Sequence, residues 1–298
     1  MSKVLLISIL ALFVCYCGQA YAQDLSEFMP IKIDDKITNF VDFRIGVESL
    51  RYEEAEPDNK RLGTAETLNS VGILDICQEY QQFQGGIRGI IPLTVGDDRE
   101  KWDVNSVMNY ETDKLSYYWS RIDGYVGYAF KESDDLTMPG IWYAGLRRSE
   151  GIQRRSDFVI GGVPSNAKVT RKIQSYGLFI GYKGQTNLAH ERRPEWSEEF
   201  TPVLVATWRV EYHKPVLNRV TDTSMPGALF KDRIGYTVEF GGGVAYNMSP
   251  SFSATFNAYG GRMYWQGSAW DNFGAGNVKW PENKTDYMGA NLGLALLF

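Results

Sequence analysis

Histidine and cysteine are scarce in this sequence, which has two histidines and three cysteines among 298 residues. Two histidines are too few for a metal site built from several imidazoles, and the cysteines lack the spacing of a zinc-binding motif. No Ser-His-Asp arrangement and no phosphate-binding glycine loop stands out either. We therefore predict no metal and no other cofactor.

The first residues have the pattern of a secretory signal peptide. Lys3 precedes the apolar stretch 4–17, and the small-x-small ending 20–22 stands before Gln23. We predict that residues 1–22 are removed on export and that residues 23–36 form a short periplasmic segment. The mature chain then keeps only Cys77, so no intramolecular disulfide is available to stabilise it.

Long apolar runs and excess positive charge are also missing. After residue 22, no segment approaches the run of about 18 apolar residues that indicates a membrane-spanning helix. The net charge is -5, and an acidic balance argues against a nucleic-acid partner. The remaining classes are a soluble exported β protein and a membrane β-barrel.

The end of the chain alternates with a period of two, which is the period of a β-strand. One face carries Met288, Ala290, Leu292, Leu294, Leu296 and Phe298, and the other carries Gly289, Asn291, Gly293 and Ala295. The first face is suited to contact with lipid. With its aromatic last residue, the stretch Leu292, Leu294, Leu296 and Phe298 resembles the C-terminal signal by which outer-membrane barrels are recognised for assembly.

Similar alternation recurs along residues 37–298, which we predict to form one all-β domain. The alternating stretches include 41–47, 83–93, 122–130, 142–147, 176–182, 204–213, 232–247 and 252–259. Residues 67–78 have a mixed phase, which indicates an irregular strand or a loop folded into the barrel mouth. The fold class is a transmembrane antiparallel up-and-down β-barrel of about ten strands, within a range of eight to twelve.

With both termini in the periplasm, the longer connections fall on the outer side. We expect outer loops near 53–66, 96–115, 150–170, 215–231 and 267–284, and inner turns near 79–81, 131–137, 184–200 and 247–251. The phase changes after Gly260-Gly261, which predicts a β-bulge there. Tyr and Trp recur near the strand ends, as in interfacial girdles, at Tyr182, Trp208, Tyr212, Tyr236, Tyr246 and Trp265.

The signal peptide, the alternating hairpins and the ending Leu292 to Phe298 resemble the small outer-membrane β-barrels of proteobacteria. The resemblance implies a monomer in the outer membrane of a Gram-negative bacterium. It also implies contacts with outer-membrane lipid and lipopolysaccharide, with periplasmic chaperones and with the barrel-assembly machinery. A basic cluster consists of Arg147, Arg148, Arg154, Arg155, Lys168, Arg171 and Lys172. It is either a contact site for lipopolysaccharide phosphates or an ordinary set of solvated charges.

The predicted lumen faces carry five charges of each sign. The acidic members are Asp42, Glu48, Asp123, Glu211 and Glu239, and the basic members are Arg44, Arg88, Arg121, Arg147 and Arg209. A ten-stranded barrel is only slightly wider than the eight-stranded barrels that side chains fill. We therefore expect these charges to pair across the lumen and close it; a selectivity constriction in an open pore is the alternative.

The candidate catalytic residues are Asp97, Asp98, Glu211 and His213, because a carboxylate beside a histidine favours general-base chemistry. The set is similar to that of the omptin proteases, ten-stranded barrels with an Asp pair and an Asp-x-His arrangement at the extracellular rim. Adjacent Asp97 and Asp98 point apart in a strand, and Glu211 replaces the expected Asp. We therefore expect a porin-like narrow channel or a structural surface barrel, with an omptin-like protease or an adhesion module as alternatives.

Deleting Phe298 should reduce the folded protein in outer-membrane fractions more than His213→Ala does, because Phe298 completes the predicted assembly signal. Cell fractionation and heat-modifiable migration in detergent gels measure both effects. Recovery of the unaltered protein as a soluble periplasmic monomer would contradict the membrane assignment.

Overall fold

The computed structural model describes residues 37–55, 61–104, 108–129, 137–187, 203–224, 229–231, 233–249, 251–268, 271–272, 277–278 and 280–298. The predicted signal peptide 1–22 and the segment 23–36 lie outside these residues. No helix in the described ranges has the length and apolar character needed to cross a membrane.

The described secondary structure consists of β-strands. The first half contains β1 (Ile37–Ala55), β2 (Arg61–Tyr80), β3 (Phe83–Val95), β4 (Asp97–Val104), β5 (Met108–Ala129), β6 (Thr137–Ile160) and β7 (Val163–Ser165). The second half contains β8 (Val169–Asn187), β9 (Val203–Asp222), β10 (Phe230–Lys231), β11 (Gly235–Ser249), β12 (Phe252–Trp265), β13 (Asp271–Asn272), β14 (Asn277–Val278) and β15 (Glu282–Leu297).

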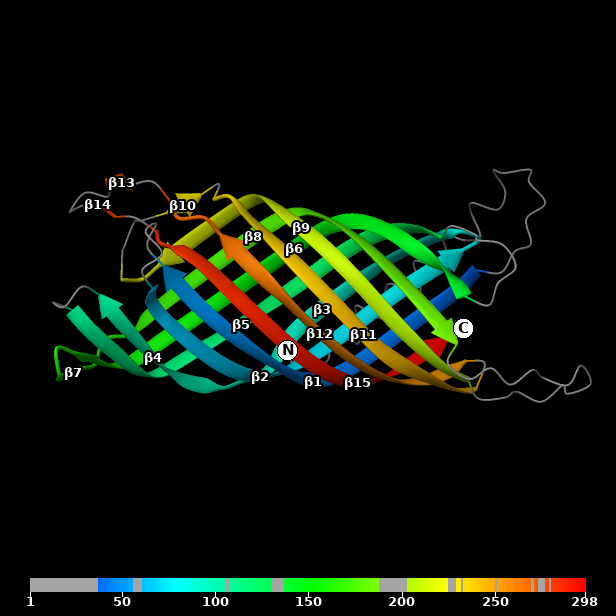
Figure 1. Cartoon of the computed structure of the whole chain (residues 1–298), viewed down its shortest axis with the longest axis horizontal. Helices are drawn as coiled ribbons and strands as arrows, with labels where there is room; N and C mark the ends of the chain where they lie inside the picture. The colour runs from blue at the N-terminus through cyan, green and yellow to red at the C-terminus, as the bar shows by residue number, and fades with distance from the viewer. Residues whose placement is uncertain are drawn as a thin grey trace, which may run out of the picture. The chain divides into compact units, whose positions relative to one another are not determined.

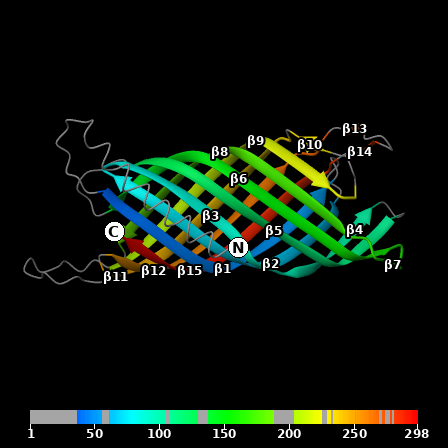
Figure 2. The same ribbon diagram turned by 180° about the vertical axis from the view of Figure 1, so that it is seen from behind.

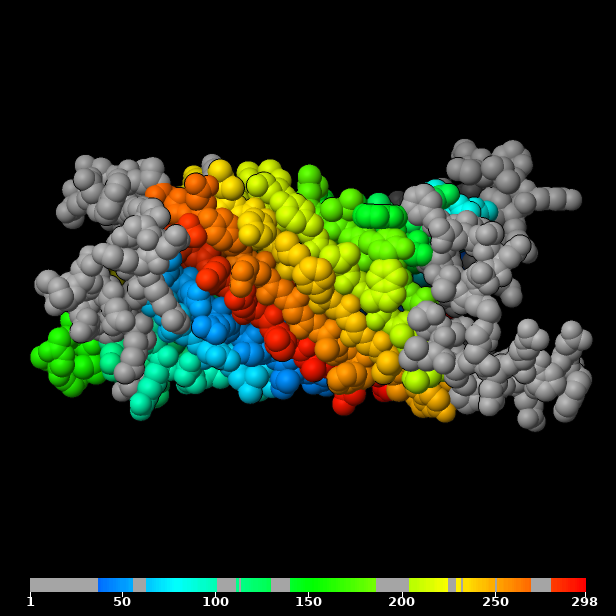
Figure 3. Space-filling view, in the orientation of Figure 1, coloured from blue at the N-terminus to red at the C-terminus, as the bar shows by residue number. Residues whose placement is uncertain are grey.

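The long strands pair antiparallel with their neighbours along the chain, and β15 pairs with β1 from Phe40–Leu297 to Ala55–Glu282. The sheet therefore closes into a ring, whose strands run diagonally in both ribbon views (Figures 1 and 2). In the space-filling view, the red band of β15 lies between the blue of β1 and the orange of β12 (Figure 3).

The number of strands differs slightly from the predicted ten. In the described residues the main sheet has thirteen strands. The difference arises because β3 and β4, separated at Gly96, both pair with β2 and β5. In addition, β7 and β10 are short strands that pair only with β6 and β9.

We name the two ends of the barrel by whether the ends of the chain lie there. The terminal end holds the start of β1, the end of β15 and the turn between β2 and β3. The distal end holds β7, β10, β13 and β14 (Figure 1). At the distal end, Gly161 and Gly162 connect β6 to β7 with positive φ angles of 56° and 82°, the conformation that two-residue hairpin turns require.

Several sequence-based boundaries are wrong. Residues 67–78 are not a loop, because β2 pairs with β1 through this whole stretch. The alternative of an irregular strand is confirmed in part, since the pairing of β2 with β3 shifts register between Ser70 and Val71. The Gly260-Gly261 bulge is absent, since β12 pairs in continuous register with β11 and β15 there. Most of the predicted outer loops 96–115 and 150–170, and the first part of 215–231, belong to strands that continue toward the distal end.

The strands continue there because the polarity of the wall reverses along the barrel axis. In the terminal half, the outer face is apolar, as at Phe43 and Leu294, which are 50% and 51% exposed. In the distal half, Leu50 and Tyr52 point inward and are buried, whereas the pair Arg262–Asp286 lies on the exposed surface. This pattern is expected of a barrel whose terminal half contacts lipid and whose distal half stands in water.

Aromatic side chains form two rows on the outer wall. Trp142, Tyr182 and Trp208 make successive ring contacts, with centroids 5.0 and 5.1 Å apart. A second row, Tyr212, Tyr236 and Tyr264, has stacked rings at 6.4 and 5.3 Å. Trp265 was predicted to belong to a girdle and does not, because it points inward and is buried. It lies beyond the polarity reversal, where apolar side chains face the interior.

Leu294→Arg should destabilise the barrel by about 2–4 kcal/mol, because it places a charge on the apolar outer face. Asn291→Ala should have a smaller effect, since Asn291 faces the interior and its amide nitrogen has no hydrogen-bond partner among the described residues. Urea titration of both variants in lipid vesicles measures the difference. The reverse order would show that the two faces are wrongly assigned.

Candidate functional site

A row of charged side chains crosses three neighbouring strands at mid-barrel. Asp123 on β5 lies opposite Arg88 on β3 and Arg147 on β6 in the strand register. Arg147 donates from Nε and Nη2 to the two Asp123 oxygens at 2.8 and 2.9 Å. Arg88 donates from Nη2 to Asp123 Oδ2 at 2.9 Å. The period of two places all three side chains on the inner face, where adjacent strands bring them into contact.

Glu211 on β9 joins this row from across the lumen. Its Oε1 accepts hydrogen bonds from Arg88 Nη2 at 2.5 Å and from Tyr143 OH at 2.7 Å, and its Oε2 accepts from Arg147 Nη2 at 2.6 Å. Because three strands separate β9 from β3, the contact with Arg88 crosses the interior, whereas the contact with Arg147 passes only β8.

A second carboxylate, Glu239 on β11, lies beside the first group. It accepts from Arg121 Nη1 at 2.7 Å, from Arg209 Nη2 at 2.5 Å and from Tyr287 OH at 2.8 Å. Arg121 Nε also lies 3.4 Å from Asp123 Oδ2, which connects the two groups. We call the connected set the lumen network: Arg88, Arg121, Asp123, Arg147, Arg209, Glu211 and Glu239.

The other three predicted lumen charges are inward but have different partners. Glu48 accepts from Trp119 Nε1 at 2.6 Å and from Tyr259 OH at 2.9 Å. Arg44 and Asp42 pair with each other, with Arg44 Nε 3.0 Å from Asp42 Oδ2. The ten predicted charges therefore fall into three groups. Seven form the lumen network, Glu48 is bound by the uncharged donors Trp119 and Tyr259, and Arg44 and Asp42 form a separate pair nearer the terminal end.

Sequence reasoning missed a second charged set, the distal network. Arg171 contacts Glu54, and its Nε lies 3.1 Å from Asp222 Oδ2. Arg155 pairs with Glu100. From the sequence, these residues were assigned to outer loops or to the basic cluster, although the alternation that places them inside the barrel was visible. The alternation that turns Arg147 inward continues along β6 and turns Arg155 inward as well.

Aromatic and loop groups pack over the distal network. Trp280 is buried, and the guanidinium carbon of Arg171 lies 4.1 Å from its ring centroid. Arg233, between β10 and β11, donates to the carbonyl oxygen of Gln266 at 2.8 Å. Burial lowers the pKa of Arg233 to about 10, so it remains charged at neutral pH.

The four candidate catalytic residues do not form one site. Asp97 accepts from Ser116 Oγ at 2.5 Å and Asp98 accepts from the Glu66 backbone at 3.1 Å, both in exposed surroundings. Glu211 and His213 are buried in the lumen. Within the described residues, no hydrogen bond or ion pair links the aspartates to the other two side chains.

In the part of the chain that the structure describes, no group of three or more His, Cys, Asp or Glu side chains is arranged to hold a metal ion.

Comparison with known proteins identifies the fold. No protein-family model and no curated protein sequence matches this chain. Among solved structures, it is similar to the outer membrane protease OmpT from Escherichia coli, with 11% identity, a TM-score of 0.57, and coverage of 90% of this chain and 99% of OmpT. The transport unit of the Escherichia coli autotransporter AIDA-I has 10% identity and a TM-score of 0.42, covering 93% and 97% of the two chains.

The fold is therefore that of an outer-membrane β-barrel. At 11% identity the similarity to OmpT concerns the fold alone, and a shared fold does not imply a shared activity.

Asp123→Ala should lower the free energy of unfolding by about 3–5 kcal/mol, because it leaves buried guanidinium groups without their carboxylate. The matched control is Asp286→Ala, since Arg262 binds Asp286 with the same two-point geometry, at 2.6 and 2.9 Å, but on the exposed surface. The control should lose only about 0–1 kcal/mol. Urea titration in vesicles compares them, and equal losses would contradict a dry lumen network.

Proposed function

We propose that this protein is a monomeric outer-membrane barrel that does not conduct solutes and that acts through its distal end at the cell surface. The supporting observation is the lumen network, whose pairs Arg88–Glu211 and Arg121–Glu239 cross the interior between strands that are not neighbours in the sheet. In this proposal the terminal end faces the periplasm, because it carries the short β2–β3 turn, the start of β1 and the end of β15.

Burial of the lumen network supports a closed lumen. Arg121, Asp123 and Glu239 are at most 1% exposed. A water-filled pore at this depth would leave the charged groups that line it accessible. Each carboxylate instead accepts several hydrogen bonds, and each arginine of the network has a carboxylate within 4.0 Å. Ion-paired side chains therefore fill the cross-section of the barrel at this depth, which favours a structural barrel over a narrow channel.

A second barrier adjoins the lumen network and extends from it toward the distal end. The buried apolar cluster there contains Leu50, Tyr52, Val71, Ile73, Ile90, Tyr117, Trp119, Tyr259 and Tyr287. A hydrated ion would have to lose its water to pass this cluster. Charge pairing and apolar packing therefore oppose conduction at successive depths.

The distal surface also supports contact with lipid phosphates. The basic cluster of the sequence divides by alternation, because Arg147, Arg155 and Arg171 are buried inside the barrel. Arg148, Arg154 and Lys172 alternate with them on the outer wall. Arg148 and Arg154 lie over outer tyrosine rings at 5.7 Å, and Lys172 pairs with Glu150 at 3.1 Å. We assign these three side chains to the lipopolysaccharide headgroup region.

The protease alternative has less support. It draws on the fold similarity to OmpT, but on β4 Asp97 is exposed and Asp98 is half-buried, while Glu211 belongs to the lumen network. Glu211 already accepts hydrogen bonds from two arginines and a tyrosine, so its charge is used in ion pairing inside the lumen network.

Planar-bilayer recordings of the purified protein should show no stable channel current. The double variant Arg121→Ala/Glu239→Ala removes an ion pair from the lumen network and should produce a leak. Arg262→Ala/Asp286→Ala removes an ion pair of similar geometry from the outer surface and should leave the bilayer sealed. Large, steady currents from the unaltered protein would overturn the closed-lumen proposal.

A further inference from the structure

A cavity of about 430 Å³ lies between the lumen network and the terminal end. Arg88 and Arg209 of the lumen network line it, so the network bounds it on the distal side. On the other side it reaches Gln81, an exposed residue of the β2–β3 turn, so it opens toward the terminal end. Its volume lies in the range of roughly 300–1,000 Å³ that is typical of small-molecule sites.

Most of the positive charge at the cavity is already neutralised by ion pairs. Arg44 pairs with Asp42, with Arg44 Nε 3.0 Å from Asp42 Oδ2. Arg88 and Arg209 bind the carboxylates of the lumen network. Among the lining cations of the described residues, Lys183 alone pairs with no carboxylate.

The two carboxylates in the lining, Asp75 and Glu79, form no ion pair within the described residues. Asp75 accepts a hydrogen bond from Tyr125 OH at 2.9 Å, and Glu79 accepts one from the amide nitrogen of Gln84. Both donors are uncharged, so neither bond neutralises the carboxylate. The cavity therefore has two available negative charges and one available positive charge, that of Lys183.

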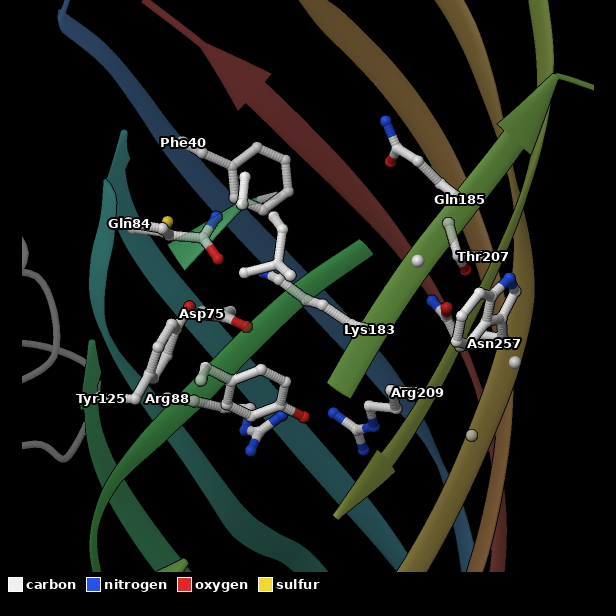
Figure 4. Close-up of a pocket in the computed structure, with 18 of the residues that line it drawn as sticks. Phe40, Asp75, Gln84, Arg88, Tyr125, Lys183, Gln185, Thr207, Arg209 and Asn257 are labelled. Carbon is white, nitrogen blue, oxygen red and sulfur yellow. Dashed lines mark hydrogen bonds between the residues drawn. The ribbon is translucent and has the colours of Figure 1, made fainter. Parts of the chain in front are cut away.

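The positive charge and one of the negative charges lie around the same ring, that of Tyr125. The hydroxyl of Tyr125 donates to Asp75, and Lys183 Nζ lies 5.8 Å from the centroid of the ring. Lys183 extends into the cavity from β8 (Figure 4). An ammonium group held against a ring keeps its hydrogen-bond donors available for a ligand. This part of the cavity therefore suits a group that carries an ammonium and a carboxylate close together, as the head group of an amino acid does.

The second carboxylate lies nearer the terminal end. Glu79 follows Asp75 by four residues on the same face of β2, which places their Cα atoms about 13 Å apart. Gln84 stands opposite Glu79 in the strand register, and its buried Oε1 has no hydrogen-bond partner within the described residues. Buried polar atoms are normally hydrogen-bonded, so a free acceptor beside an unpaired carboxylate indicates a ligand with a donor such as an ammonium group.

The lining between the two carboxylates is apolar. Cys77 occupies the intervening inward position of β2, and Phe40 stands opposite it in the register with β1. Figure 4 shows Phe40 beside Gln84 in the cavity wall. A surface of this kind suits a methylene chain that connects one charged end of a ligand to the other.

We infer that this cavity is a binding site for a dibasic amino acid such as L-lysine, which enters from the terminal end. Lys183 binds the α-carboxylate, and Asp75 binds the α-ammonium group. The side-chain ammonium group donates to Glu79 and to Gln84 Oε1, and the apolar lining contacts the methylene chain. With two positive charges and one negative charge, the ligand complements the three charges that the cavity leaves unpaired.

Isothermal titration of the purified protein in detergent with L-lysine tests this inference against two analogues. Cadaverine lacks the carboxylate of L-lysine, and L-norleucine lacks its side-chain ammonium group. We expect saturable binding of L-lysine and at least roughly tenfold weaker binding of each analogue, because each loses a charge-assisted hydrogen bond.

Two variants test the individual contacts. Lys183→Met should weaken L-lysine binding by roughly tenfold without weakening cadaverine binding, and Glu79→Gln should weaken L-lysine binding by roughly tenfold without weakening L-norleucine binding. The matched control is Glu66→Gln. Glu66 lies on the same strand and also accepts from an uncharged donor, Ser49 Oγ at 3.0 Å, but on the exposed outer face. This control should leave the affinity for all three compounds unchanged.

Heat-modifiable migration verifies that each variant is folded. Absence of saturable L-lysine binding would overturn the inference, as would equal affinity for either analogue or equal effects of Glu79→Gln and Glu66→Gln. Unchanged L-lysine affinity in Lys183→Met would also overturn it. These outcomes are independent of the bilayer recordings, because a closed barrel without this site neither conducts solutes nor binds L-lysine.

Discussion

The charge pairing around Asp123 is the constraint on which the rest of the barrel depends. Asp123 has no exposed surface, and Arg88, Arg121 and Arg147 each place a nitrogen within 3.4 Å of it. Removing a carboxylate from water carries a large desolvation penalty, which is offset only by close opposite charges and satisfied hydrogen bonds. The arginines must in turn be satisfied, and Glu211 and Glu239 accept from Arg88 and Arg121 across the interior. The ion pairs around one buried charge thus connect strands that are not neighbours in the sheet.

The same network separates the interior into two regions with different chemistry. On its distal side, the interior is filled by apolar clusters and the distal network. On its terminal side, a cavity remains, lined by rings and by side chains of both charges. Because the wall has a constant strand period, this difference comes from the residues at each depth and not from a change in backbone geometry. The surface role that we propose uses the distal end of this closed barrel.

The polarity reversal along the wall explains how strands of about twenty residues remain stable. A barrel spans the hydrocarbon core with roughly 9–11 residues of each strand. The nineteen residues of β1 exceed this length, and its outer face changes from Phe43 and Ile45 to Arg51 and Glu53. Beyond the lipid, apolar side chains are stabilised by facing the interior, as Leu50 and Tyr52 do.

The sequence by itself determined the all-β fold and the inward position of all ten predicted lumen charges. It could do so because alternation in a strand is a local property that one segment displays alone. Only the tertiary structure decided which charges meet, since Arg88 and Glu211 are 123 residues apart and belong to strands that are not paired. It also decided that Asp97 and Asp98 lie apart from His213. The strand ends were misjudged because exposed distal strands carry the polar residues of loops, and only pairing with neighbouring strands distinguishes the two.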